Sequence, residues 1–111
     1  MTTGYRPRLA YEEDEARRIN AAYERIMGRR LDVSNGKCLV TVRIIARNIA
    51  DDVGIEYNAR LTQHVHKLLS ADPKVKFWGF GASRCWDKHR LKKYASTASQ
   101  VFSVNREGVV R

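Results

Sequence analysis

The chain of 111 residues has few of the features that define cross-linked, metal-bound or membrane-spanning proteins. It has two cysteines, Cys38 and Cys85, and neither belongs to a CxxC pair. This excludes a disulfide framework and a cysteine zinc site. No apolar run approaches the roughly 18–20 residues that cross a bilayer, so we expect no membrane partner. The N-terminal residues MTTGYRPRLAYEEDE have no apolar segment typical of a secretory signal, and we expect an intracellular protein of the cytoplasm or nucleoid.

Acidic residues are scarce in the last third of the chain. Residues 73–111 carry nine basic and two acidic side chains, a net charge of +7, whereas residues 1–36 and 37–72 each carry a net +1. A basic surface confined to one part of a protein attracts polyanions, most commonly nucleic acid. A solvated basic tail is the alternative, but basic residues here are interleaved with aromatic ones and do not form a low-complexity segment.

The hydrophobic pattern predicts a single α+β domain. Apolar residues make up 43% of the chain, which is enough for a core. Apolar side chains three and four residues apart predict helices, and one short β-branched run predicts a strand. The predicted order is a loose basic arm over residues 1–8, a helix over 9–30, a strand over 38–42, a helix over 43–53 ended by Gly54, and a helix over 57–72 capped by Asn58.

The stretch KFWGFGASRCW, residues 76–86, holds four of the ten aromatic residues. Two β-favourable segments joined by a glycine-containing link predict a hairpin over 75–86. Strand alternation then places Phe77 inward, and Trp78 and Phe80 on the opposite face. There Trp78 either packs beneath the tail or stacks on bases.

Beyond the hairpin the pattern is less defined. A short helix is expected after Asp87, and residues 9–95 together form the predicted domain. Residues 96–111 are a C-terminal tail or an extra strand, and an extended arm, an edge strand and a disordered tail all fit their composition.

A helix-turn-helix pattern is present in TVRIIARNIADDVGI, residues 41–55, and in the helix that follows. Ala50 is small where two helices cross closely, Gly54 permits a sharp turn, and Ile55 closes the corner behind it. With the preceding strand and the following hairpin, this order resembles the winged helix-turn-helix DNA-binding family over residues 11–91. The expected fold is a three-helix core with a short strand and a β-hairpin wing.

The resemblance implies that the helix over residues 57–72 enters the major groove of double-stranded DNA and that the wing contacts the backbone or the minor groove. Helical rotation places Leu61 and Val65 on the buried side and polar side chains opposite them. Arginine and glutamine can contact base edges, and lysine suits phosphate. The candidate contacts are Asn58, Arg60, Thr62, Gln63, His66 and Lys67 on the helix, Ser83 and Arg84 at the wing, and Lys88 and Arg90 behind it.

Three functions are compatible with these features. The first is a transcription regulator that binds double-stranded DNA, and the absence of acids from helix residues 57–71 slightly favours a polyanion site. The second is a ribosome-associated domain that binds structured RNA, and the third is a protein-assembly module. For the helix residues, an ordinary solvated face is the alternative. A homodimer through the first helix, with Tyr11, Ala16 and Met27, or through the C-terminal tail remains open.

The cysteine and histidine residues suggest little further chemistry. In winged domains the strand before the motif pairs with the outgoing strand of the wing, so the resemblance places Cys38 opposite Cys85 and allows a disulfide. Two free thiols are the default inside cells. His64 and His66 point about 200° apart on a helix and cannot hold one metal ion. We expect no metal, no cofactor and no enzymatic activity.

Overall fold

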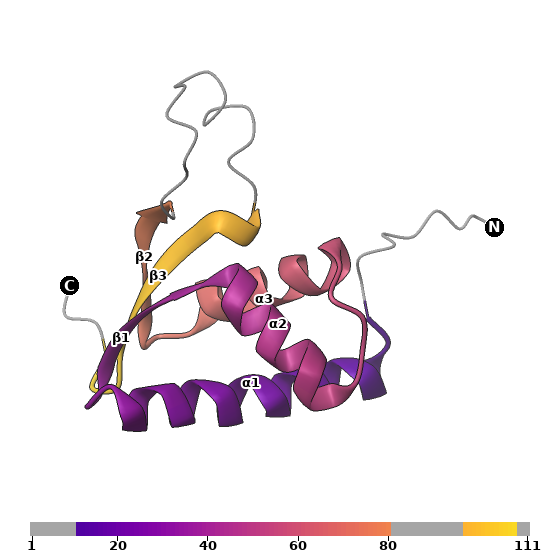
Figure 1. Cartoon of the computed structure of the whole chain (residues 1–111), viewed down its shortest axis with the longest axis horizontal. Helices are drawn as coiled ribbons and strands as arrows, with labels where there is room; N and C mark the ends of the chain where they lie inside the picture. The colour runs from indigo at the N-terminus through magenta and orange to yellow at the C-terminus, as the bar shows by residue number, and fades with distance from the viewer. Residues whose placement is uncertain (1–10, 81–96, 109–111) are drawn as a thin grey trace, which may run out of the picture.

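Three helices and a three-stranded antiparallel sheet make up the parts of the chain that the computed structural model describes, residues 11–80 and 97–108 (Figure 1). In order these elements are α1 (Glu13–Val33), β1 (Lys37–Thr41), α2 (Val42–Val53), α3 (Ala59–Ala71), β2 (Val75–Phe80), the 3-10 turn η1 (Thr97–Ser99) and β3 (Gln100–Asn105). The α+β class, the three helices and the strand that precedes α2 are confirmed.

The long helix α1 forms because acids occupy its first turn and Arg30 its last, which matches the helix dipole. Its apolar side chains recur on one face, where Ile19, Ala22 and Tyr23 are buried. Asn35 and Gly36 then adopt left-handed φ angles of 67° and 95°, as the Ser-Asn-Gly turn requires, and lead the chain into β1.

Side-chain caps fix the start of both α2 and α3, and a glycine fixes the end of α2. The side chain of Thr41 accepts a hydrogen bond from the backbone of Ile44 at the start of α2, and Asn58 does the same for Leu61 in α3. Gly54 ends α2 in the left-handed region, at φ 81°, and its N–H donates to the carbonyl of Ala50 over 2.8 Å. The two helices and the glycine stop between them are therefore formed where the sequence predicts them.

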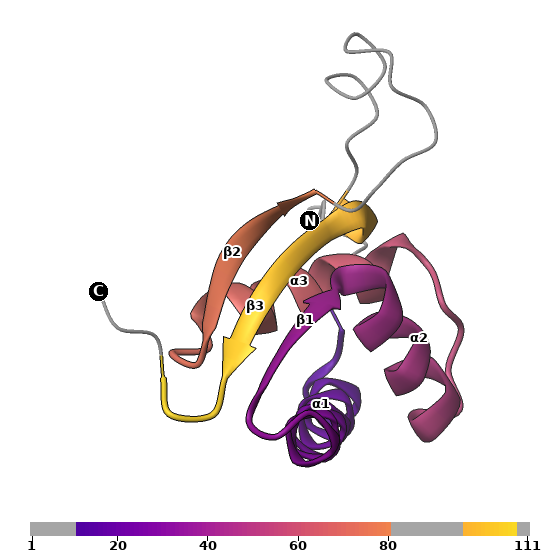
Figure 2. The same ribbon diagram turned by 60° about the vertical axis from the view of Figure 1, so that its left-hand side comes forward.

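The sheet differs from the predicted hairpin. Its strand order is β1-β3-β2, so β3 lies in the centre and both other strands pair with it (Figure 2). Within the described residues β2 pairs with Gln100–Asn105, whereas the outgoing half of the hairpin predicted over 75–86 lies outside them. The extra-strand alternative for residues 96–111 holds, but the strand is central and not at an edge.

A bulge in β2 also corrects the predicted alternation of its aromatic residues. Phe77 lies opposite Phe102 and Gly79 lies opposite Val101, so Trp78 is an extra residue in the ladder. The bulge moves Phe80 to the same face as Phe77, and the two rings are in contact with centroids 5.7 Å apart. Phe77 lies on the core-facing side of the sheet with Phe102, as expected, but its ring is half exposed because it lies beyond the helices' cover.

The core lies between the three helices and the helix side of the sheet. Its largest fully buried side chains are Ile19, Met27, Val40, Val42, Ile45, Ile49, Leu61, Val65, Leu69 and Val104. Tyr11 packs against this cluster, and Ala16 is half-buried. Met27 is therefore a core residue, and Tyr11, which precedes α1, packs against the core, so for these two residues the structure favours a core position over a dimer surface.

Several sequence predictions concern residues outside the described ranges. The short helix after Asp87, and the side chains Ser83, Arg84, Lys88 and Arg90, all fall there. The basis for a Cys38–Cys85 bridge is wrong, however, because Val104 is the residue opposite Cys38 in the strand that pairs with β1. Cys38 is a free thiol.

Candidate nucleic-acid interface

The outward face of α3 is the candidate interface. Packing of Leu61, Val65 and Leu69 into the core fixes the rotation of the helix. Lys67 lies opposite this buried stripe and is exposed, and Arg60 and Gln63 flank it half-buried. The three side chains expected in the major groove are therefore on one face.

Two of the predicted helix contacts are already engaged inside the protein. Thr62 is 7% exposed, and its hydroxyl donates to the carbonyl of Ala59 over 2.9 Å, which corrects its assignment as a phosphate ligand. The side-chain oxygen of Asn58 accepts the N–H of Leu61 over 3.0 Å. Asn58 is thus a helix cap first, and Thr62 is a buried structural residue.

Arg60 is held by an aromatic ring from before α1. Its guanidinium carbon lies 4.7 Å from the centre of the Tyr11 ring, which is cation–π geometry. Burial raises the pKa of Tyr11, and the nearby charge of Arg60 opposes that effect only in part. The phenol therefore stays neutral, and its ring restricts the rotamers of Arg60.

A matching contact on α2 was missed from the sequence. The guanidinium of Arg47 lies 4.7 Å above the ring of Tyr57, the second residue before α3. Arg47 is exposed, so it adds a positive charge beside the start of α3. The helical pattern of α2 puts Arg47 outward, but its meeting with Tyr57 depends on the path of the turn that Gly54 begins.

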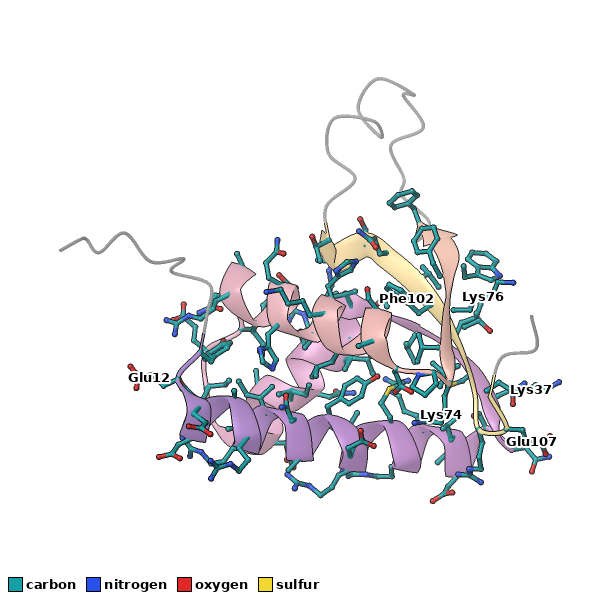
Figure 3. The ribbon with its side chains drawn as sticks, turned by 180° about the vertical axis from the view of Figure 1, so that it is seen from behind. Glu12, Lys37, Lys74, Lys76, Phe102 and Glu107 are labelled. Atoms are coloured by element: carbon teal, nitrogen blue, oxygen red, sulfur yellow. The ribbon has the colours of Figure 1, made fainter. Side chains whose placement is uncertain are left out.

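The C-terminal part of the chain meets α3 through two glutamine contacts. Gln63 donates to the hydroxyl of Thr97 over 3.4 Å, and His66 shares a 3.0 Å hydrogen bond with the side-chain oxygen of Gln100. The ring of His66 also contacts Phe102, with centroids 5.9 Å apart, and Figure 3 shows Phe102 beside α3. His66 is therefore a half-buried link between α3 and β3, not a freely exposed contact.

A hollow of about 550 Å³ adjoins the first turns of α3. It is lined by Tyr57, Asn58, Ala59, Thr62, Gln63, Thr97 and Ala98. Backbone N–H groups of the first turn of a helix are partly free and favour anions. Gln63 belongs both to the lining of this hollow and to the outward face of α3, so the two adjoin each other.

The electrostatics of α3 favour a polyanion. Residues 57–71 contain Arg60 and Lys67 and no acidic side chain.

The two histidines of α3 have separate environments. The pKa of His64 is lowered, first by burial and then by the charge of Lys67, which favours the neutral imidazole. Its ring nitrogen shares a 2.9 Å hydrogen bond with the side-chain oxygen of Asn20. His64 and His66 contact different partners, Asn20 and Gln100. In the described ranges no group of three potential ligands could hold a metal ion.

Comparisons with other proteins identify no family for this chain. The chain matches no protein-family model, no curated protein and no solved structure. Among residues 11–80 and 97–108, none of the helices has the length and apolar character needed to cross a membrane.

Proposed function

We propose that this protein is a winged-helix protein that binds double-stranded DNA, with α3 in the major groove, and that it regulates transcription. The fold-level support is the order of helix, strand, two helices and two strands, with β3 between β1 and β2. The observation that carries the proposal is the outward face of α3. Arg60, Gln63 and Lys67 share it, and no acid lies on the helix.

Each side chain on this face has a distinct role in the proposal. Arg60, positioned by Tyr11, contacts a base edge. Gln63, on the same face, exchanges its long hydrogen bond to Thr97 for a second base contact. Lys67 and Arg47 hold phosphates on either side of the groove. The segment between β2 and β3 lies outside the described residues, and its sequence contains the expected backbone contacts Arg84, Lys88 and Arg90.

The test compares two double variants that remove the same charge. Arg60→Ala/Lys67→Ala changes α3, whereas Arg17→Ala/Arg18→Ala changes α1, where Arg17 forms surface ion pairs with Glu13 and Asp14. Affinity for duplexes selected from a random pool is measured by fluorescence anisotropy at physiological salt. The α3 variant is expected to bind at least about tenfold more weakly, because a good base contact contributes roughly 1–3 kcal/mol. The α1 variant is expected to bind as the natural protein does.

Salt dependence and an RNA competitor separate the other functions. Loss of a phosphate contact at Lys67 should reduce the slope of log affinity against log salt by about 1. Structured RNA that competes more strongly than duplex DNA would favour the ribosome-associated alternative. Absence of any salt-sensitive binding would favour a protein-assembly module. Equal affinity of both double variants would refute the assignment of α3.

A further inference from the structure

A chain of aromatic contacts runs from α3 to the exposed edge of the sheet. The ring of His66 on α3 contacts Phe102 on β3, with centroids 5.9 Å apart. Phe102 contacts Phe77 on β2 at 5.6 Å, and Phe77 contacts Phe80 at 5.7 Å. Phe102 is buried, whereas Phe77 and Phe80 are 49% and 50% exposed. The aromatic chain therefore begins beside the candidate DNA-binding helix and ends in solvent.

The bulge at Trp78 creates this arrangement. Residues three apart in a regular strand lie on opposite faces, so Phe77 and Phe80 would be separated. The extra residue brings both rings to the face that Phe102 occupies. Phe80 lies opposite Gln100, which is hydrogen-bonded to His66, so the exposed pair is one cross-strand step from α3.

Two half-exposed phenylalanines in contact on β2 form an exposed apolar surface, which makes this strand a candidate binding site. Among the described strands β2 is at the edge of the sheet, because the order is β1-β3-β2. Basic residues outnumber acids in the elements that carry this surface. Residues 57–80 contain four basic side chains and one acid, Asp72. Lys74 pairs with Asp72 at 3.1 Å, which leaves the positive charges of Arg60, Lys67 and Lys76 in excess and favours an anionic occupant.

We propose that Phe77 and Phe80 form a stacking platform for unpaired DNA bases next to the duplex that α3 binds. This proposal rests on the proposed function and specifies its substrate as a duplex adjoining single-stranded DNA, such as a melted or tailed end. Stacking on aromatic rings tolerates any base, because every base has a π-face. The basic and polar side chains of α3 hold the duplex, and the platform receives the first bases beyond it.

The experiment measures affinity for three ligands with the same duplex. The first is blunt, the second carries a single-stranded extension on the order of 10 nucleotides, and the third carries an extension of equal length made of abasic sites. The natural protein is expected to prefer the tailed duplex over both others by about tenfold, since stacking contributes roughly that much per one or two bases. The abasic tail has the same phosphates and therefore separates stacking from charge.

The variants are Phe80→Ala, Phe80→Tyr and Leu39→Ala. Leu39 is a matched control, because it is 51% exposed and lies on the other edge strand, β1. Phe80→Ala is expected to lose the preference for the tail and keep its affinity for the blunt duplex. Phe80→Tyr and Leu39→Ala are expected to keep the preference. Circular dichroism of each variant confirms that the fold is retained.

The possible outcomes separate this proposal from the proposed function. An unchanged tail preference in Phe80→Ala, an equal loss on blunt and tailed duplexes, or no tail preference in the natural protein would overturn the platform. In each of these cases the affinity for the blunt duplex still tests duplex binding by α3. If the blunt duplex is not bound but the tail is, the platform stands and duplex recognition by α3 fails. If neither is bound, both proposals fail.

Discussion

The hydroxyl of Tyr23 donates a 2.8 Å hydrogen bond to the carboxylate of Asp72, although the two residues are 49 positions apart. The bond joins the middle of α1 to the C-terminal cap of α3. Burial alone would raise the pKa of Asp72, but hydrogen bonds from the backbone of Lys74, from Tyr23 and from the Lys74 side chain lower it overall. The Asp72 side chain is 6% exposed, so it depends on these donors.

Removing the tyrosine hydroxyl tests this link. Tyr23→Phe is expected to lower the free energy of unfolding by about 1–3 kcal/mol at neutral pH, because a nearly buried carboxylate loses a donor. Since the folded pKa of Asp72 lies below its unfolded value, this contribution is complete above about pH 4 and is lost as pH falls through the folded pKa. The difference between variant and natural protein should therefore shrink in acid. Urea denaturation over a pH series measures it, with Tyr57→Phe as the control, and a constant difference would contradict the link.

His64 is expected to make the free energy of unfolding depend on pH in a second, higher range. Its folded pKa lies below 6.5, first because of burial and then because of Lys67. Folding therefore favours the neutral imidazole, so its contribution is complete above about pH 6.5 and is lost as pH falls through that value toward the folded pKa. We expect the unfolding free energy to decrease between neutral pH and about pH 5, and His64→Gln to remove part of this slope. A slope that is identical in the variant would assign the effect to other groups.

Two glycines are expected to respond in opposite directions to the same substitution. Gly54→Ala should lower the unfolding free energy by about 1–2 kcal/mol, because φ is 81° there and a Cβ opposes that conformation. Gly28 lies within α1, and a Cβ at this position would meet nothing within 4 Å. Gly28→Ala should raise stability by roughly 0.5–1 kcal/mol. Chemical denaturation of the pair measures both, and destabilisation by Gly28→Ala would show that α1 is packed more closely here.

The helices were predictable because their determinants are local. Apolar spacing placed Leu61 and Val65 in the core, and Asn58 and Gly54 act as the cap and the left-handed stop that their chemistry predicts. The outward position of Lys67 follows from the same rotation. The buried position of Thr62 follows from the rotation too, because Thr62 comes three residues before Val65 and seven before Leu69, and its hydroxyl bonds its own helix.

Pairing of the strands was not predictable in the same way. The strand that pairs with β2 begins only at Gln100, whereas β2 ends at Phe80. The sequence just before Asp87 is closer to β2 and is also rich in residues that favour strands. The sequence of β3 does contain one signal for a central strand, which is the adjacent apolar pair Val101 and Phe102. Adjacent residues of a strand point to opposite faces, so such a pair indicates a strand that is covered on both sides, and both residues are buried. The bulge at Trp78 has no such signal, since it arises from the register between β2 and β3.

The pairing of Arg60 with Tyr11 yields a final prediction, which joins the proposed function to a contact that no helical pattern could reveal. Tyr11→Ala leaves Arg60 without the ring that restricts its rotamers, so more conformational entropy is lost on binding. We expect duplex affinity to fall by about two- to tenfold, within the range of an exposed or partly desolvated cation–π contact. Tyr11→Phe keeps the ring and should bind as the natural protein does, as measured by anisotropy on the selected duplex. In an Arg60→Ala background, Tyr11→Ala should have no further effect, and an additive loss would instead place Tyr11 itself at the DNA.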